Sequence, residues 1–303
     1  MTNIVFFGSE DFSLASLKEL VDNGFPVVAV VTKPDSARNR GHKVSQPKVK
    51  IFAERYGIRV LQPNKLSEIA DDIASLHKPV GILVSYGKII PQSIIDLFEP
   101  GIINIHPSLL PLYRGPSPIE AAILNGDKST GISIMQLDAG MDTGPVYHQV
   151  EVALHNNETG PALLETLSKR GATELIGVLP NILDYSLKPQ PQDNKLATYT
   201  HLIQKDASIV DWNKSALQIE CEVRAYSSWP QSRTKLGKVE VILTKVHVEH
   251  GNQLPGEIIQ PNPRTLFIGT GKDLLSVDAV KPLGKKEMPI SAFLSGYKQH
   301  LGF

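Results

Sequence analysis

Ile4-Val5-Phe6-Phe7-Gly8-Ser9-Glu10-Asp11-Phe12 begins the chain with a short apolar run that stops at a glycine. Leucines then recur at helical spacing from Leu14 until Asn23-Gly24, a pair that commonly ends a helix. The β-branched run Val27–Thr32 follows and is typical of a buried strand. A strand, a helix and a second strand in this order predict a βαβ unit with parallel strands.

The same alternation continues along the chain. Further apolar runs predict strands at Arg59–Leu61, Gly81–Val84, Gly101–His106, Gly131–Leu137 and Val146–Val152, and helical spacing recurs at Val49–Tyr56, Ser117–Leu124 and Glu158–Leu187, the last bent or broken at Pro180. We therefore predict an α/β, Rossmann-like domain whose mostly parallel sheet carries helices on both faces. Ligands of such folds gather outside the carboxyl ends of the strands.

The pattern changes near residue 188. Lys188–Asn194 is rich in proline and polar residues, which predicts an extended linker. Beyond it a helix near Asn213–Tyr226 precedes short predicted strands at Val239–Val246, Gly256–Gln260, Thr265–Ile268 and Leu274–Ala279. This pattern favours a small β-barrel that is like the oligonucleotide-binding (OB) fold. We predict a catalytic domain over residues 1–187, a linker over 188–200 and a C-terminal OB-like domain over 201–303.

Composition limits the classes of protein that need to be considered. With 303 residues the chain is long enough for two domains, and its formal net charge of zero counts mildly against a strongly basic nucleic-acid binder. No apolar run approaches the length of a membrane span and no signal peptide is visible, so a membrane partner is not expected. The only cysteine, Cys221, cannot form an internal disulfide, which fits a cytoplasmic location.

The chemistry is concentrated in Asn104-Ile105-His106-Pro107-Ser108-Leu109-Leu110-Pro111 and in Asp142 between two glycines. Asn104 and His106, two residues apart on a predicted strand, point to the same face. Both can donate hydrogen bonds to an oxyanion, and Asp142 can hold His106 in its charged form or accept a proton from an attacking amine. These three catalytic candidates favour direct transfer of a small acyl group to an amine.

Other chemistries fit less well. Gly8-Ser9-Glu10-Asp11-Phe12 lacks the later glycines of a dinucleotide-binding loop, so a dehydrogenase is disfavoured. No phosphate-binding loop, serine-hydrolase motif or zinc-ligand spacing is present, and no metal is expected.

Asn104–Pro111 with Tyr113-Arg114-Gly115, and Met135–Gly144, resemble the signature of formyltransferases that depend on 10-formyltetrahydrofolate. The resemblance extends over most of the chain. Within this family the chain looks like the members that formylate the α-amino group of methionine on initiator tRNA, because Arg40-Gly41-His42-Lys43 and Val210-Asp211-Trp212 resemble their segments. His42 departs from the usual lysine of that basic loop, and Leu112 from a usual basic residue.

The resemblance implies a set of roles. Asn104, His106 and Asp142 match the catalytic positions. The folate-binding candidates are Ser108, Leu109, Leu110 and Pro111, together with Val84, Tyr86 and Gly87 through backbone groups near the pterin. The tRNA-contact candidates are Arg40 and Lys43, and the resemblance implies that the OB-like domain, residues 201–303, also binds tRNA. The partners expected are 10-formyltetrahydrofolate and initiator methionyl-tRNA, and the chain is expected to be a monomer.

Two alternatives stay open at this point. The acceptor could be an amino sugar nucleotide, glycinamide ribonucleotide or another small amine, although Asp211-Trp212 and the basic loop favour tRNA. The chain could also be a non-catalytic protein that binds RNA or folate, which the intact Asn104, His106 and Asp142 argue against.

Overall fold

The computed structural model describes residues 2–37 and 44–302. Their contacts divide the chain into two compact units. The first contains residues up to Gly115, Ser129–Ala153 and Leu164–Thr200, and the second contains Pro116–Lys128, Leu154–Leu163 and the remainder from His201. The Pro-rich stretch 188–200 therefore groups with the first unit.

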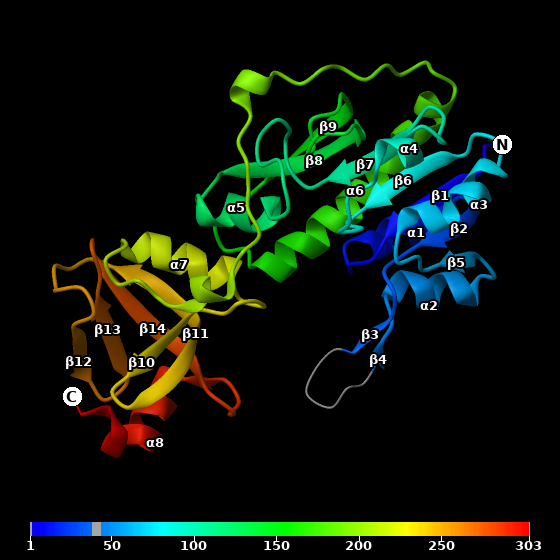
Figure 1. The fold of residues 1–303 in the computed structure, drawn as a ribbon. Coiled ribbons are helices and arrows are strands. Elements are labelled where there is room, and N and C mark those ends of the chain that lie inside the picture. The colour runs from blue at the N-terminus through cyan, green and yellow to red at the C-terminus, as the bar shows by residue number, and fades with distance from the viewer. Residues whose placement is uncertain (1, 38–43, 303) are drawn as a thin grey trace. The chain divides into compact units, whose positions relative to one another are not determined.

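The first unit is built on a seven-stranded sheet (Figure 1). Its strands, in order across the sheet, are β5 (Arg59–Leu61), β2 (Val27–Val31), β1 (Ile4–Gly8), β6 (Val80–Val84), β7 (Ile102–His106), β8 (Ser129–Gln136) and β9 (Val146–Ala153). The strands from β5 to β7 pair in parallel, whereas β7–β8 and β8–β9 pair antiparallel. The prediction of a mostly parallel α/β sheet is confirmed.

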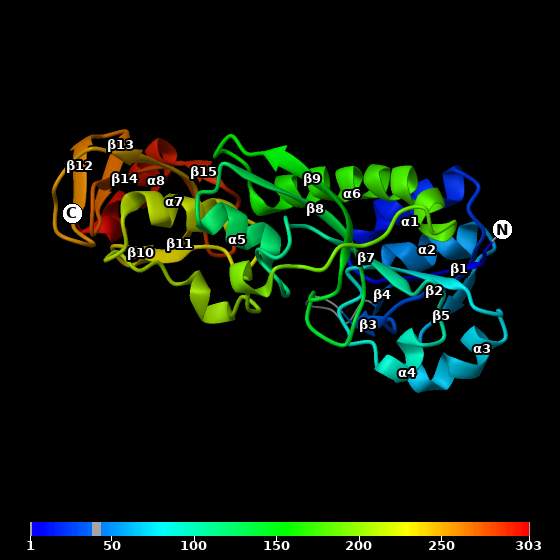
Figure 2. The ribbon, with the colours of Figure 1, turned by 90° about the horizontal axis from the view of Figure 1, so that it is seen from above.

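Helices cover both faces of this sheet (Figure 2). The elements α1 (Ser13–Asp22), α2 (Lys48–Arg55) and α6 (Gly160–Leu183) lie on one side, and η1 (Leu66–Ile69), α3 (Ala70–Ala74) and α4 (Gln92–Ile95) lie on the other. Because both faces are covered, all five residues of β1 are buried. Two short pieces complete the unit: the hairpin β3 (Ser36–Ala37) and β4 (Val44–Ser45), and the turn η2 (Asn194–Leu196).

Helix α6 spans Gly160–Leu183, inside the predicted range Glu158–Leu187. Pro180 lies inside it without breaking it, because the helix continues to Leu183. Proline removes only one backbone donor, and Leu175, Leu179 and Ile182 are fully buried on the inner face of the helix. Their packing holds the last turn in place.

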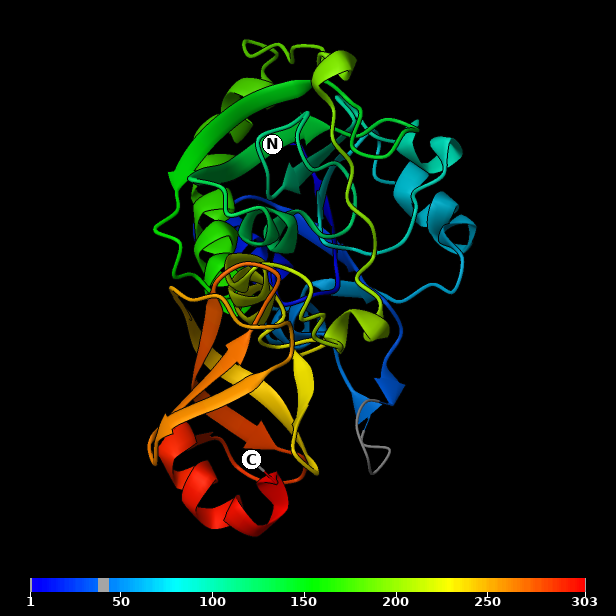
Figure 3. The ribbon, with the colours of Figure 1, turned by 90° about the vertical axis from the view of Figure 1, so that its left-hand side faces the viewer.

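The second unit is a curled antiparallel sheet with helices packed on it (Figure 3). Its strands are β10 (Arg233–Leu236), β11 (Val239–Glu249), β14 (Leu274–Pro282), β13 (Thr265–Gly269) and β12 (Ile258–Asn262) in order, with β15 (Met288–Pro289) beside β14; its helices are α5 (Pro118–Leu124), η3 (Lys205–Ser208), α7 (Ala216–Ala225) and α8 (Ile290–Leu301). Phe293 and Leu294 of α8 and Ile219 and Val223 of α7 complete its apolar core. The predicted small β-barrel is confirmed in the form of this half-barrel.

Candidate active site

The site lies where the strand order of the first sheet reverses, between β1 and β6. Connections leave this point in opposite directions, which opens a crevice at the carboxyl ends of the strands. Gly8 ends β1, and the backbone N–H groups of the next two residues, Ser9 and Glu10, both donate to the Ser85 carbonyl just after β6, at 3.3 Å each. His106 ends the neighbouring strand β7. Three strand ends are thereby brought to one edge of the sheet.

Strand β7 carries two of the catalytic candidates. Ile102 at its start packs in the core beneath α3 and α4, while Ile105 packs against Gly171 of α6 on the opposite face. Since side chains alternate along a strand, Asn104 and His106 lie on the Ile102 face. Both residues are buried, at 5% exposure each.

The Asn104 carboxamide makes no side-chain hydrogen bond to the protein within residues 2–37 and 44–302. Its amide atoms are not sealed from solvent, so a bound molecule can reach them. Asn104 thus has the property required of a donor to a bound carbonyl oxygen.

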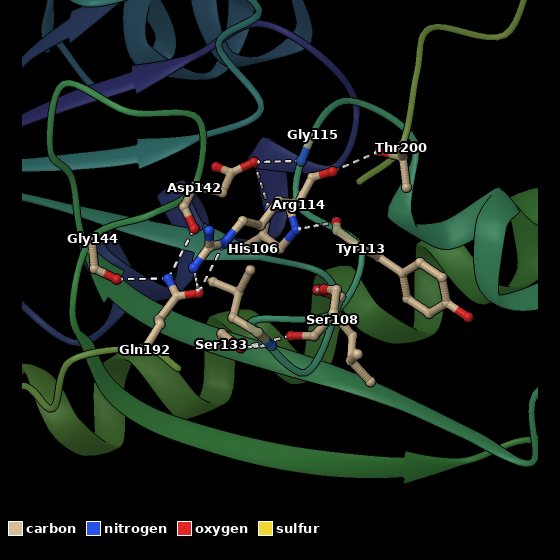
Figure 4. Close-up of polar contacts among 12 residues, drawn as sticks. His106, Ser108, Tyr113, Arg114, Gly115, Ser133, Asp142, Gly144, Gln192 and Thr200 are labelled. Atoms are coloured by element: carbon tan, nitrogen blue, oxygen red, sulfur yellow. Dashed lines mark hydrogen bonds and ion pairs between the residues drawn. The ribbon is translucent and has the colours of Figure 1, made fainter. Parts of the chain in front are cut away.

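His106 has a protein partner at each ring nitrogen (Figure 4). Nε2 lies 3.0 Å from the backbone oxygen of Tyr113, and Nδ1 lies 3.6 Å from Oδ2 of Asp142. A carbonyl only accepts hydrogen bonds, so Nε2 carries a hydrogen. A second proton on Nδ1 would give an imidazolium facing the Asp142 carboxylate, the charged pair that the sequence predicts.

Asp142 reaches the histidine from the loop that joins β8 and β9. Its Oδ2 also accepts a hydrogen bond of 2.8 Å from the backbone N–H of Gly115. Its backbone has φ +54°, a left-handed conformation that few residues other than glycine adopt. Asp138 stabilises the turn by accepting from the Gly140 N–H at 3.0 Å and the Thr143 hydroxyl at 2.8 Å.

The segment Ser108–Pro111 follows His106 and is fixed to β8 and β9. The Ser133 hydroxyl donates to the Ser108 carbonyl at 2.7 Å and accepts from the Leu110 N–H at 3.0 Å. Gln149 adds a hydrogen bond of 2.8 Å to the Leu110 carbonyl. The Ser108 hydroxyl is occupied internally, because it donates to the Leu112 carbonyl at 2.6 Å. This segment is a rigid wall beside His106.

Val84, the last residue of β6, and Tyr86 and Gly87, which follow it, differ in which of their groups reach solvent. The side chains of Val84 and Tyr86 are buried, and the Tyr86 ring packs edge-on against Phe7. Burial raises the pKa of the Tyr86 phenol to about 12. Gly87 has φ +69°, a left-handed conformation in which any side chain is strained, and its exposed backbone is open to a ligand.

The tRNA-contact candidates Arg40 and Lys43 lie outside the described residues. The base of their loop is fixed at Asp35, whose carboxylate accepts from Lys50 at 2.7 Å and from Gln62 at 2.8 Å. These two hydrogen bonds, Lys50 first, lower the pKa of Asp35. Gln46, on the other side of the loop, donates to the same carboxylate at 3.3 Å, so both ends of the loop are held at Asp35.

Metal-ligating side chains do not cluster at the site. Among the residues that the structure describes, no three histidine, cysteine, aspartate or glutamate side chains are grouped so as to hold a metal ion.

Sequence reasoning missed two residues near the site. Arg114 is 1% exposed, although the sequence shows it only as part of a motif. Gln192, which the sequence places in a linker, bonds to Arg114 and to the loop of Asp142. A buried arginine cannot be recognised from the sequence, because its partners are 78 residues or more away along the chain.

Two family models match the chain, the formyl transferase model over residues 2–179 and the formyl transferase C-terminal domain model over residues 202–298. The chain belongs to the formyl transferase family. Among its relatives is a methionyl-tRNA formyltransferase of Thermodesulfovibrio yellowstonii, 36% identical over 303 residues, which are 99% of this chain and 98% of the relative. The chain is thus a formyl-transferring enzyme.

Solved formyltransferases share the fold. The methionyl-tRNA formyltransferase from Clostridium thermocellum superposes with a TM-score of 0.59 at 17% identity, over 93% of this chain and 99% of the other. The N-formyltransferase from Helicobacter canadensis, in complex with folinic acid and dTDP-3-aminofucose, gives 0.70 at 19% identity, over 91% and 99%. At these identities the likeness establishes the architecture of both units.

Proposed function

We propose that the chain transfers the formyl group of 10-formyltetrahydrofolate to the α-amino group of methionine carried by initiator tRNA. The observation that carries the proposal is the match to methionyl-tRNA formyltransferase from Thermodesulfovibrio yellowstonii along almost the whole of both chains. The match includes the half-barrel unit, which the formyl transferase C-terminal domain model also covers over residues 202–298.

In this reaction the amine nitrogen bonds to the formyl carbon, and the bond from that carbon to the folate nitrogen breaks. The proton that leaves the amine ends on the folate nitrogen. Negative charge develops on the formyl oxygen, which requires donors placed in advance. Asn104, with its unpartnered carboxamide, supplies one such donor. His106 stabilises the charge as an imidazolium. The Asp142 carboxylate receives the proton from the amine and passes it to the folate nitrogen.

In this proposal two segments of the chain bind the folate. One is Ser108–Pro111, anchored on Ser133 and Gln149. The other is the turn Val84–Gly87, which follows a buried strand end and in which Ser85 has φ +49° and Gly87 has φ +69°. Backbone N–H and C=O groups suit the hydrogen-bonding edge of a pterin, because they present donors and acceptors at fixed positions.

The tRNA is held by lysine and arginine side chains, which contact phosphates without reading bases. Arg40 and Lys43 belong to this set, and the half-barrel unit, residues 201–303, adds others. We also keep the predictions of a cytoplasmic location and a monomeric state as parts of the proposal. Among the described residues no helix is both long and apolar enough to cross a membrane.

The test is an assay with 10-formyltetrahydrofolate and three acceptors in parallel: methionyl-initiator tRNA, a deoxythymidine-diphosphate amino sugar and glycinamide ribonucleotide. We expect the formyl group on the methionyl amine, identified by mass after hydrolysis of the ester. Formylation of a small acceptor with none on the tRNA would reject the proposed acceptor. No transfer to any amine would favour the non-catalytic alternative.

A further inference from the structure

The Arg114 guanidinium is a buried cation held by neutral groups. Nε and Nη2 donate to Oε1 of Gln192 at 3.1 and 2.7 Å, Nη2 also donates to Asn194 at 2.7 Å, and Nη1 donates to the Tyr199 hydroxyl at 3.1 Å. Within the described part of the chain no carboxylate lies within ion-pair distance of it. An arginine buried in this way is unusual, because desolvation of the charge is only partly repaid by neutral acceptors. Its location next to the catalytic candidates calls for a role.

Both the oxygen and the nitrogen of the Gln192 side-chain amide have hydrogen-bond partners. Its oxygen accepts the two guanidinium hydrogen bonds, and its nitrogen donates to the backbone oxygens of Asp142 at 2.8 Å and Gly144 at 2.7 Å. Only one orientation of the amide works, because the arginine can only donate and the carbonyls can only accept. The positive charge of Arg114 also polarises the amide and strengthens its N–H donors.

The backbone on either side of Arg114 holds the histidine and the aspartate (Figure 4). The preceding carbonyl, of Tyr113, is the partner of His106 Nε2, and the following N–H, of Gly115, donates to the Asp142 carboxylate. The side chain of Arg114 then reaches the Asp142 backbone through Gln192. Both members of the His106–Asp142 pair are thus tied to the same residue.

The position of Arg114 is fixed in turn by the stretch that precedes residue 201. The Arg114 N–H donates to the Thr198 carbonyl at 2.9 Å, and the Arg114 carbonyl accepts from the Thr200 N–H at 2.7 Å. The Thr198 hydroxyl accepts from the Tyr113 N–H at 2.8 Å. These bonds attach the segment to the motif as an added strand would.

We propose that Gln192, oriented by Arg114, is a positioning residue that sets the Asp142 carboxylate against His106. The Asp142 backbone is left-handed, a conformation that is unfavourable for a residue with a side chain and persists only when neighbours enforce it. The hydrogen bonds from Gln192 hold the carbonyl oxygen of Asp142 itself and that of Gly144, two residues farther on, and so enforce the conformation. The inference deepens the proposed function, on which it rests.

The variant that isolates this role is Gln192→Glu. It keeps an acceptor for the buried arginine, and so keeps that structural contact, but it replaces the two donors by an oxygen that repels the carbonyls of Asp142 and Gly144. The matched control is Gln190→Glu, because Gln190 is exposed and only its backbone is bonded, to Val146. We expect kcat to fall by roughly 10²-fold in Gln192→Glu, the order observed when reacting groups are misplaced, with KM for both substrates unchanged. The control should retain the wild-type kcat.

A second measurement asks whether the effect passes through the aspartate. In an Asp142→Asn background, Gln192→Glu should cause little further loss of single-turnover rate, because a residue that acts through Asp142 has nothing left to position. Additive losses, or a Gln192→Glu enzyme whose kcat equals that of the control, would overturn the proposal. Should the carboxylate unfold the chain, Gln192→Met is measured instead, as it lacks both donor and acceptor and should also lower kcat.

One readout does not depend on the acceptor. The ring ¹⁵N resonances of His106 report its pairing with Asp142, and we expect them to move in Gln192→Glu and not in Gln190→Glu. Unmoved resonances would reject the positioning role even if the enzyme formylates tRNA. A wild-type protein that formylates no tRNA, while the resonances move as expected, would reject the acceptor and leave the positioning role intact.

Discussion

Nδ1 of His106 lies 3.6 Å from Oδ2 of Asp142, and that same oxygen accepts the Gly115 N–H at 2.8 Å. The carboxylate is therefore fixed by the backbone and stands slightly farther from the ring than a normal hydrogen bond. This spacing leaves the aspartate able to attract a charged ring without locking it. A proton arriving from the amine can be accepted with a small movement of either side chain.

Asn104→Ala should lower kcat by roughly 10²–10³-fold, the cost of one oxyanion donor, about 2.7–4 kcal/mol. Thermal unfolding should change little, because the amide has no protein partner to lose. Steady-state kinetics and calorimetry on the same preparations check both statements. Asn252→Ala, at an exposed position, is the control, and an Asn104→Ala enzyme as fast as that control would contradict the donor role.

Asp142→Asn should lower kcat by roughly 10²-fold or more, since it removes the group that receives the proton. Asparagine keeps an oxygen for the Gly115 N–H, so the loop should stay folded. Single-turnover rates of formyl transfer measure the chemical step apart from product release. Asp22→Asn, at an exposed position at the end of α1, serves for comparison. Equal single-turnover rates in Asp142→Asn and Asp22→Asn would show that Asp142 takes no part in the transfer.

Tyr86→Phe should raise the free energy of unfolding by about 1 kcal/mol, because the buried phenol oxygen has no hydrogen-bond partner in the described chain. The raised pKa adds a pH dependence. From pH 10.0, the ordinary value, to about 12 the unfolded chain loses the phenol proton and the folded chain keeps it, so wild-type stability falls with rising pH. The Tyr86→Phe variant has no phenol to ionise, so its stability should not fall for this reason as pH rises. Urea unfolding at pH 8 and pH 10.5 tests it, and a less stable phenylalanine variant would show that the hydroxyl is needed.

His247 on β11 should make the stability of the second unit depend on pH. Its Nδ1 lies 2.9 Å from Asp278, and this hydrogen bond is the main cause of its raised pKa. The contribution is complete below the unfolded value of 6.5 and disappears as pH rises through the folded value. Asp278→Asn should therefore destabilise the protein at pH 6 by at most about 1 kcal/mol, since the pair is half exposed, and have less effect at pH 9. An effect that grew with pH would have the wrong sign.

Binding of methionyl-initiator tRNA should weaken steeply as salt concentration rises, because phosphate contacts release counterions. Replacing Arg40 and Lys43 together by alanine should weaken binding and reduce the slope of log K against log salt by about one for each phosphate that is no longer neutralised. Filter binding at several salt concentrations gives the slope. Lys18→Ala, an exposed cation on α1, should leave it unchanged. A flat salt response in the wild-type enzyme would contradict phosphate-mediated binding.

The sequence predicted elements whose signal is local. Apolar runs indicated the strands around β1, β2, β6 and β7, and the motif at Asn104–Pro111 pointed to the edge of the sheet where His106 lies. The antiparallel pairing of β8 and β9 was not visible, because strand direction is decided by neighbours distant in sequence. The same holds for Gln192: proline and polar residues correctly indicate extended backbone, but cannot tell a free linker from a strand that docks.

The interleaving of the two units has a practical consequence for dissecting the enzyme. Residues 116–128 and 154–163 lie between stretches of the first unit yet pack within the second, where α5 lies against α7. No single cut in the backbone can therefore release either unit whole. A fragment ending at residue 187 would lose Gln192, and one ending at Thr200 would leave α5 without its neighbour. A protease nick near residue 200 should instead give two pieces that stay associated through the packing of α5 on α7 and separate only on denaturation.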